Sequence, residues 1–192
     1  MWVVKLGGSL DRNPLLRDWL ERLAAEGVGR VVIVPGGGRF ADAAREAQQH
    51  WGFDDLAGHN LAVLGMAQMA QLLKGLCPAL RCARDETEVR AQLAAGAVPV
   101  WMPLDLLRVA PDELTNWGVT SDSLALWLAA RLQAEGVIVV KSCAVPPGAD
   151  EDALAQAGIV DAGFAAYRAR LVCPVRVVSA TDWEALPRLM AP

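Results

Sequence analysis

The sequence predicts an α/β fold in which helices cover both faces of a mostly parallel, open sheet. Three observations lead to this prediction. Short apolar runs of strand length alternate with helix-length segments along the 192 residues. Several of these runs show no polar alternation, which is typical of strands buried on both faces. Two of them end in clusters of glycines, and ligands of open parallel sheets bind where strands end.

The composition indicates a soluble globular domain. Hydrophobic residues make up 54% of the chain and charged residues 21%, which predicts a sizeable core. The net charge of −4, without a cluster of lysines or arginines, argues against a nucleic-acid partner. No apolar run approaches the roughly 20 residues of a membrane helix, and Met1 leads directly into a strand rather than a signal peptide. We therefore expect a single cytoplasmic domain whose four cysteines, which lack metal-ligand spacing, are buried reduced thiols.

The first predicted strand, residues 2–6, contains a lysine and ends in glycines. Lys5 lies in an otherwise apolar segment, where an unpaired ammonium group is costly, so it requires a carboxylate or a phosphate as partner. An edge strand with Lys5 facing water is the alternative. The sequence Gly7-Gly8-Ser9, which breaks the strand, favours a ligand site.

The second predicted strand, residues 31–34, leads through Gly36-Gly37-Gly38 into a helix predicted over residues 41–49. Such a turn presents free backbone N–H groups and the positive end of the helix dipole, which together favour a phosphate. Three consecutive glycines favour anion binding over a turn that merely requires positive φ. Arg39, at the start of the helix, is placed either to reach the anion or to lie in solvent.

The remaining segments continue the alternation of strands and helices. Apolar spacing, caps and stop signals predict strands over 97–102, 136–140 and 175–178, and helices over 14–25, 54–76, 86–94, 124–132, 151–156 and 164–169, with a final helix that Thr181 caps and that ends at Pro187. Gly65 is a point at which the 54–76 helix could be interrupted. His59 lies on that helix, where a lone histidine is more often structural than catalytic.

A polar stretch, residues 114–123, precedes the helix predicted over 124–132. Its last four residues offer a cap and an acid at the positive end of that helix: Thr120, Ser121, Asp122 and Ser123. Capping alone explains one or two of them. The remaining density of small polar groups, with Asn116 just upstream, suggests a site.

The strand predicted over 136–140 is followed by Lys141, which occupies the place that Lys5 has on the first strand. Two lysines at the carboxyl ends of buried strands indicate one rim of an open sheet. Phosphoryl transfer requires in-line positioning and positive charge more than covalent chemistry, and glycine loops with two lysines supply both. The sequence shows no Ser-His-Asp or Cys-His set and no metal-ligand cluster, so a kinase is the best interpretation.

Two other nucleotide-binding motifs bear on this interpretation. The P-loop pattern G-x-x-x-x-G-K-[ST] is absent. Residues 36–41 formally match G-x-G-x-x-A, with Asp54 and Asp55 some distance on, which leaves a dinucleotide fold open. That interpretation leaves Lys5 and Lys141 unexplained.

Four motifs in order resemble the amino acid kinase superfamily, which includes aspartokinase, acetylglutamate kinase, uridylate kinase and isopentenyl phosphate kinase. They are Lys5-Leu6-Gly7-Gly8-Ser9, Pro35-Gly36-Gly37-Gly38, Thr120-Ser121-Asp122 and the strand that ends in Lys141. The resemblance spans residues 2–141. It implies a three-layer αβα sandwich, with an acceptor-binding half (1–110) and a nucleotide-binding half (111–192), and it implies a homo-oligomer.

The resemblance also implies a role for each matching residue. Lys5 would contact the transferring phosphoryl group, Lys141 would stabilise the leaving phosphates, and Asp122 would orient both lysines. The residues expected to bind ATP are Gly7, Gly8, Ser9, Thr120 and Ser121, and those expected to bind the acceptor are Gly36, Gly37, Gly38, Arg39, His59 and Asn116. Mg²⁺ would arrive on the ATP phosphates, with few or no protein ligands.

Three details resemble one short branch of the superfamily. They are Gly38-Arg39-Phe40-Ala41-Asp42, the helix from His59 to Gln68 with Met66, and Gly158-Ile159-Val160-Asp161. The enzymes of this branch phosphorylate an aminomethylfuran-methyl phosphate to its diphosphate in methanofuran-type cofactor synthesis.

After Lys141 the chain departs from the superfamily pattern. The superfamily commonly continues with a Thr-Asp-x-Asp-Gly-like turn that shapes the nucleotide pocket, whereas this chain has Ser142-Cys143-Ala144-Val145-Pro146-Pro147 and a short C-terminal half. The alternative function is therefore a degenerate member that binds a nucleotide or phosphometabolite as a regulatory or partner subunit. A carboxylate or another alkyl phosphate is the alternative acceptor.

Overall fold

The computed structural model, which describes residues 1–191, contains one sheet of six strands. The strands are β1 (Trp2–Leu6), β2 (Val31–Pro35), β3 (Arg81–Ala83), β4 (Pro99–Trp101), β5 (Gly136–Lys141) and β6 (Val175–Ser179). Their order across the sheet is β3-β4-β2-β1-β5-β6, and every pairing is parallel. The predicted open parallel sheet is confirmed, with β1 between β2 and β5.

Side chains of the central strands alternate between two separate cores, one on each face of the sheet. One core contains Val3, Val32 and Val139 and packs against α5 (Ser121–Leu132). The other contains Val4, Ile33 and Ile138 and packs against α1 (Leu15–Glu26). By the same alternation Lys5 faces α5. The edge-strand alternative for Lys5 is therefore wrong, because β1 is central and Lys5 is buried.

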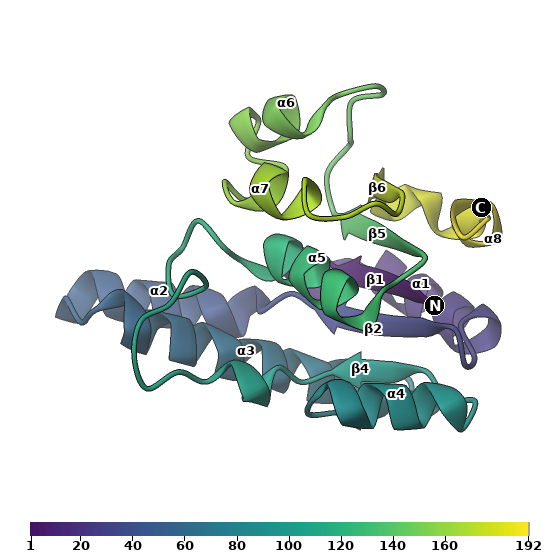
Figure 1. The fold of residues 1–192 in the computed structure, drawn as a ribbon, viewed down its shortest axis with the longest axis horizontal. Coiled ribbons are helices and arrows are strands. Elements are labelled where there is room, and N and C mark those ends of the chain that lie inside the picture. Colours follow the sequence, from purple (N-terminus) through teal and green to yellow (C-terminus); the bar gives the residue numbers. More distant parts are fainter. Residues whose placement is uncertain (192) are drawn as a thin grey trace.

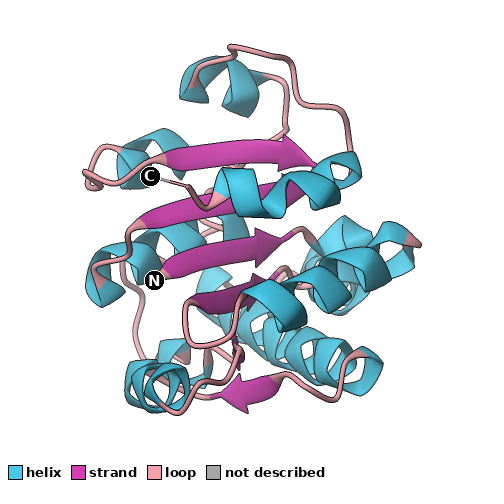
Figure 2. Cartoon of the chain, turned by 90° about the vertical axis from the view of Figure 1, so that its right-hand side faces the viewer, coloured by secondary structure: helices cyan, strands magenta, loops and turns pink. Residues whose placement is uncertain are grey.

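Helices cover both faces of this sheet, which gives the three layers expected (Figure 2). On the face of α5 lie α4 (Glu86–Ala94), α6 (Glu151–Gln156) and α7 (Phe164–Arg168). On the face of α1 lie η3 (Ala180–Ala185) and α8 (Leu186–Leu189). The long helices α2 (Gly38–Trp51) and α3 (Asp55–Leu76) pack along each other and extend beyond the carboxyl ends of the strands (Figure 1). They form one wall of the region where the strands end.

The loops after β1 and β2 lie against each other, and glycines permit this approach. A Cβ atom on Gly8 would lie 2.4 Å from the Gly38 nitrogen, and one on Gly36 would lie 2.2 Å from the Gly8 nitrogen. Gly38, the first residue of α2, has a φ of +53°, which favours glycine. Backbone packing therefore requires these glycines, whether or not an anion binds beside them.

Two helices begin earlier than predicted. The apolar spacing predicts starts at 41 and 124, whereas α2 begins at Gly38 and α5 at Ser121. In both cases glycines or small polar residues form the first turn, and these carry no apolar period. α3 is not interrupted at Gly65; a Cβ there would lie 2.9 Å from the Ala41 nitrogen, so the glycine lets α2 pack closely.

Two further expectations are wrong, and one strand was not expected. The short strand β3 was not predicted, because three residues that begin with exposed Arg81 show no period. The final turns are capped by Ser179 rather than by Thr181: Asp182 accepts from the Ser179 N–H, and Ser179 Oγ accepts from the Thr181 N–H. The four free cysteines are not buried, since Cys143 is exposed and the other three are partly exposed.

Candidate active site

Lys5, Asp122 and Lys141 form a buried ion trio at the carboxyl ends of two neighbouring strands. Lys5 pairs in register with Val139 of β5, and Lys141 lies two residues further along that strand. Both lysines therefore point to the face on which α5 carries Asp122. Lys5 Nζ lies 2.6 Å from Asp122 Oδ1, and Lys141 Nζ lies 2.8 Å from Asp122 Oδ2. The ion trio thus connects two strands to the first turn of a helix.

Burial determines the electrostatics of the ion trio. Lys5 is 2% exposed and Asp122 is 4% exposed. Burial lowers the pKa of Lys5 below the ordinary lysine value, and Asp122 offsets only part of this effect. Burial also opposes ionisation of Asp122, but the two lysines outweigh it and hold the pKa of its carboxyl below the ordinary value. One carboxylate shared by two ammonium groups leaves an excess positive charge, which suits an anionic ligand.

Asp161, in the segment between α6 and α7, fixes the turn that carries Asp122. Its carboxylate accepts hydrogen bonds from the backbone N–H groups of Thr120 (2.8 Å) and Ser123 (3.0 Å), and from the hydroxyls of both residues. The Gly163 N–H also donates to the Gly118 carbonyl oxygen at 2.7 Å. The polar residues at the start of α5 therefore do not cap the helix with their own side chains. A carboxylate 41 residues after Thr120 does so.

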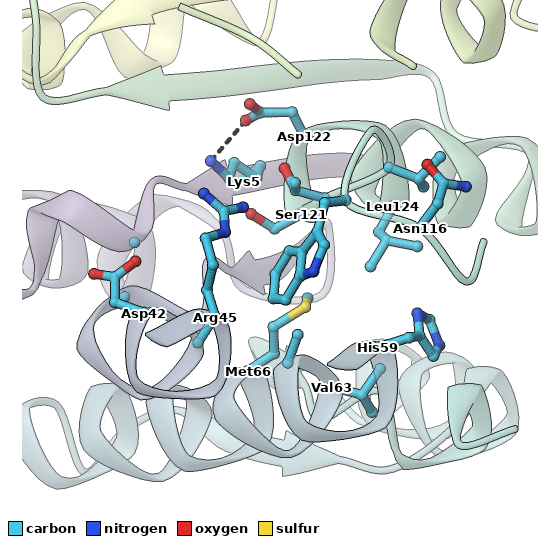
Figure 3. Close-up of a pocket in the computed structure, with 18 of the residues that line it drawn as sticks. Lys5, Asp42, Arg45, His59, Val63, Met66, Asn116, Ser121, Asp122 and Leu124 are labelled. Atoms are coloured by element: carbon cyan, nitrogen blue, oxygen red, sulfur yellow. Dashed lines mark ion pairs between the residues drawn. The ribbon is translucent and has the colours of Figure 1, made fainter. Parts of the chain in front are cut away.

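A cavity of about 280 Å³ lies between the ion trio and the helices α2 and α3. Figure 3 shows Arg45 of α2 directed toward Lys5 and Ser121, while Val63 and Met66 line the side formed by α3. The apolar wall also includes Val119 and Leu124. A small molecule in this cavity would contact positive charge at one end and apolar side chains along its length.

Most of the residues predicted for the site line this one cavity. They are Lys5, Gly8, Ser9, Gly37, Gly38, His59, Asn116, Thr120, Ser121, Asp122 and Lys141. Ser9 Oγ lies 2.7 Å from Ser142 Oγ, which connects the segments that follow β1 and β5.

Three predicted residues, Gly7, Gly36 and Arg39, do not line the cavity. The Gly7 N–H donates to the Val140 carbonyl oxygen at 3.0 Å, and Gly36 packs against Gly8. Arg39 Nε lies 2.6 Å from the Asp11 carboxylate. The guanidinium group of Arg39 is therefore paired with Asp11 while its side chain stays exposed, which is closer to the solvent alternative than to the anion site.

His59 holds the segment 103–119 against α3, and Asn116 fixes a turn within that segment. His59 is 8% exposed, and its Nε2 donates to the Leu106 carbonyl oxygen at 2.9 Å. Asn116 Oδ1 accepts from the Gly118 N–H at 2.9 Å, and its Nδ2 donates to the Glu113 carbonyl oxygen at 3.1 Å. These contacts support the structural interpretation of His59, although both residues reach the cavity wall.

Arg45 and Trp117 are among the cavity residues that sequence reasoning missed. The Arg45 guanidinium lies 4.4 Å from the centre of a Trp117 ring. The Trp117 indole N–H donates to Gln48, and Gln48 Nε2 donates to Asp55 at 2.9 Å, so the tryptophan is held by α2 and α3. Arg45 lies two helical turns after Gly38, and this spacing is the signal that puts it on the cavity side of α2.

A second cavity, of about 230 Å³, lies beside β6. It is lined by residues 145–149, by Leu154 and Phe164, and by three valines of β6, with Glu151 and Asp182 as its acidic residues.

Within residues 1–191, no three His, Cys, Asp or Glu side chains gather as they would around a metal ion. None of the helices described is long and apolar enough to cross a membrane.

The fold and the ion trio together define an open parallel α/β protein with a positively charged site where its central strands end. The sequence model of the amino acid kinase family matches residues 1–144, and the chain belongs to this family.

One relative is the 5-(aminomethyl)furan-3-yl-methyl phosphate kinase of Methanocaldococcus jannaschii. It is 28% identical over 141 residues, which are 72% of this chain and 64% of the relative. The chain thus matches slightly less than two thirds of that relative's length.

Solved structures show the same fold at lower identity. The uridylate kinase of Archaeoglobus fulgidus superimposes with a TM-score of 0.70 at 18% identity, covering 97% of this chain and 95% of that structure. An isopentenyl phosphate kinase superimposes with a TM-score of 0.63 at 16% identity, covering 97% of this chain and 95% of that structure. Both matches extend beyond residue 144 and therefore include the C-terminal segment.

Proposed function

We propose that this protein is an ATP-dependent kinase that transfers the γ-phosphoryl group to a small-molecule acceptor. The observation that carries the proposal is the buried ion trio, because two lysines that share one aspartate supply uncompensated positive charge at the rim of the sheet. Phosphoryl transfer depends mainly on such charge and on in-line positioning. Family membership supports the same conclusion.

The proposed reaction assigns a role to each member of the ion trio. An acceptor oxygen attacks the γ-phosphorus, a new P–O bond forms, and the bond to the bridging oxygen breaks with its electron pair going to ADP. Lys5 stabilises charge on the transferring phosphoryl oxygens, and Lys141 stabilises charge on the leaving phosphates. Asp122 contacts neither the transferring phosphoryl group nor the leaving phosphates. It holds the two lysine ammonium groups in place.

The nucleotide is proposed to extend from the ion trio toward the segment after β5. The second cavity is lined by residues 145–149, which follow the Lys141 region, and by Leu154 and Phe164, against which a purine ring would pack. This would leave the larger of these two cavities, which lies between the ion trio and the helices α2 and α3, for the acceptor. Mg²⁺ is implied by the family and would be held by the ATP phosphates, since residues 1–191 show no cluster of ligands for it.

The first candidate acceptor is 5-(aminomethyl)furan-3-yl-methyl phosphate, hereafter aminomethylfuran phosphate, the substrate named for the M. jannaschii relative. The larger cavity suits this compound chemically. Its apolar wall of Val63, Met66 and Leu124 would pack against a furan ring. Asp42 and Asp55 also line the cavity and are the side chains available to an ammonium group.

The direct test is a ³¹P NMR assay of the full chain with Mg-ATP and aminomethylfuran phosphate. We expect ADP and a new diphosphate ester in equal amounts. A parallel reaction with its dephosphorylated alcohol, and another with a panel of small carboxylates, tests the alternative acceptors. ADP formation with a carboxylate only would retain the kinase but reject the phosphate acceptor.

A binding protein without turnover is the second candidate. The segment after Lys141 lacks the acidic-glycine turn, and the family match ends at residue 144. Calorimetric titration with Mg-ATP separates the two functions. Micromolar binding without ADP formation for any acceptor would favour the binding protein, whereas turnover that is lost in Lys5→Ala would exclude it.

A further inference from the structure

We propose that the outer edge of β6 recognises the adenine ring of the nucleotide through its backbone. The Val175 carbonyl oxygen accepts from the 6-amino group, and the Val177 N–H donates to N1. This assignment rests on the proposed function, because it names the base that the second cavity selects. It is carried by the place of that cavity on the edge of the sheet, by the two backbone groups that face it, and by their separation from Lys141.

The pairing of β6 determines which of its backbone groups point outward. β6 is the last strand in the order of the sheet and pairs with β5, with Val175 opposite Val137 and Val177 opposite Val139. The Val137 N–H donates to the Pro174 carbonyl oxygen at 2.9 Å, so Pro174 and every second residue after it face β5. The N–H and C=O groups of Val175 and Val177 therefore point away from the sheet.

Ser179, two residues further along β6, shows the same direction. Its N–H leaves the sheet and donates to the Asp182 carboxylate at 3.0 Å. Within residues 1–191, the structure assigns no hydrogen-bond partner to the outward groups of Val175 and Val177. The Val175 C=O and the Val177 N–H thus present the acceptor and the donor to which a further strand would pair.

The second cavity lies directly on this edge. Val175 and Val177 pack toward the core on the α5 face and Val178 toward the core on the α1 face, yet all three line the cavity. A cavity that reaches side chains of both faces lies in line with the sheet rather than above one face. Its outer wall includes residues 145–149 and Leu154 of α6, and Figure 1 shows α6 on the outer side of β6. This wall takes the place of a further strand, which leaves the edge to a small planar group.

Adenine is the base whose hydrogen-bonding edge fits the two outward groups. Its 6-amino group is a donor and the adjacent N1 is an acceptor, so one ring bonds the Val175 C=O and the Val177 N–H together. Leu154 and Phe164 line the same cavity and would pack against the ring. Guanine has an acceptor at position 6 and a donor at position 1. In the same orientation it would place acceptor against acceptor and donor against donor.

The position of these groups along β6 suits a nucleotide whose phosphates lie at the ion trio. Lys141 pairs with Ser179 at the rim of the sheet, and Val177 lies two residues before Ser179. Two residues of strand span about 7 Å, to which the side chain of Lys141 adds its own length. A ribose and a phosphate chain bridge a separation of this order. The base then rests on β6 while the γ-phosphate lies beside Lys5.

Calorimetric titration of the full chain with nucleoside diphosphates and Mg²⁺, without acceptor, tests the base contacts. The probes are ADP, 1-deaza-ADP, which lacks the N1 acceptor, purine riboside diphosphate, which lacks the 6-amino group, and GDP. We expect the last three to bind at least about 5-fold more weakly than ADP, because each leaves at least one backbone group without its partner. The matched control is 7-deaza-ADP, which is altered on the side of the ring away from β6 and should bind like ADP.

Proline variants test the edge of β6 itself. Val177→Pro removes the N–H that bonds N1 and should abolish the preference for ADP over 1-deaza-ADP. Val175→Pro is the matched control, because it removes an outward N–H outside the proposed pair and keeps the carbonyl oxygen; the preference should remain. Edge strands tolerate proline where the N–H points away from the neighbouring strand. If Val177→Pro does not fold, as judged by circular dichroism, the comparison of probes on the wild type decides.

The possible outcomes separate this inference from the proposed function. Equal binding of ADP and 1-deaza-ADP, or a preference that survives in Val177→Pro, overturns the inference whether or not the ³¹P NMR assay detects transfer. A wild type that binds none of the probes also overturns it, and the NMR assay then decides separately whether the protein is a kinase. A preference for ADP that is lost in Val177→Pro, in a protein that transfers no phosphoryl group, would retain the adenine site and reject the kinase.

Discussion

The side of the ion trio formed by α2 and α3, which is the proposed acceptor side, and the segment beyond Lys141 are built very differently. On the acceptor side, α2 and α3 are 14 and 22 residues long and pack along each other. In the segment beyond Lys141, α6 and α7 have six and five residues, and loops connect them. The family match covers the first region and ends at residue 144, at the start of the second.

This difference shows that the residues matched by the family model include the charged side chains of the ion trio. They do not include every residue that holds those side chains in position. Lys5, Asp122 and Lys141 all lie within the matched residues, whereas Asp161, which fixes the turn that carries Asp122, lies outside them. A segment that departs from the pattern is therefore still part of the architecture of the site. The following experiments test the two regions separately.

The largest effect is expected for Lys5→Met, which removes a charge from the region that the family model matches. Methionine fills a similar volume without the ammonium group, so the fold should be retained. We expect kcat to fall about 10²- to 10³-fold, as when one charge-stabilising donor is removed from an active site. Steady-state ADP release measures this. The control is Arg17→Ala, which removes an exposed arginine of α1 on the other face of the sheet. A variant that keeps more than a tenth of the rate would contradict the role of Lys5.

Asp122→Asn should have the largest effect on stability. It leaves two lysines facing each other in a buried site, at a cost of about 3–5 kcal/mol. The folded-state pKa of Asp122 is lowered, so its stabilisation is complete above the ordinary aspartate pKa of about 3.9. That stabilisation is lost as the pH falls through the folded-state pKa.

Urea unfolding at a series of acidic pH values tests this prediction. The wild type should lose more stability than Asp122→Asn as the pH falls below about 4. Equal losses in the two proteins would show that Asp122 does not contribute through its charge.

Gly8→Ala tests whether the glycine loops on the acceptor side are required for packing. The new methyl group would meet the backbone of Gly38 at 2.4 Å, and backbone cannot move aside easily. We expect a loss of about 1–3 kcal/mol in urea unfolding. Gly75→Ala is the control: it lies inside α3 with no atom within 4 Å of the added Cβ, and should stabilise by about 0.5–1 kcal/mol. A Gly8 variant as stable as the wild type would contradict the close approach.

Asp161→Ala tests the contribution of the C-terminal segment and should have the smallest effect on stability. Loss of a helix cap costs about 1–2 kcal/mol. Because the uncapped turn carries Asp122, we also expect kcat to fall about 10-fold, with a smaller change in the KM for the acceptor. Asp85→Ala is the control, since Asp85 caps α4 through the Glu88 N–H at 2.8 Å. It should cost similar stability and leave kcat unchanged; a similar fall in kcat would show that Asp161 acts through general stability alone.

The sequence predicted the central strands and the members of the ion trio because both have local signals. Apolar runs of five or six residues are distinctive, and a lysine inside such a run requires a partner. Asp161 carries no comparable signal. Its role as a cap depends on a loop that returns 41 residues later, and no local pattern encodes that return. Arg45 and Trp117 are similar, since they meet only when segment 103–119 folds over α2.

The partner of Arg39 could not be predicted for a related reason. Its position at the start of α2 suggested either the anion or solvent, but the partner is Asp11, supplied by η1 (Gly8–Arg12) after β1. Competition from a carboxylate elsewhere in the chain cannot be predicted from position on a helix. The same holds for β3, whose strand character comes from pairing with β4 rather than from its own sequence.

The register between β1 and β5 also has a consequence for folding fidelity. Lys5 and Lys141 meet Asp122 only when β5 pairs with β1 in the observed register. A slip of one residue would turn Lys141 to the opposite face and bury Asp122 with half of its partners. Valine-rich strands alone would tolerate several registers almost equally well. The ion trio therefore makes the misaligned sheets unstable, and the same charges that favour phosphate also select the correct alignment of the central strands.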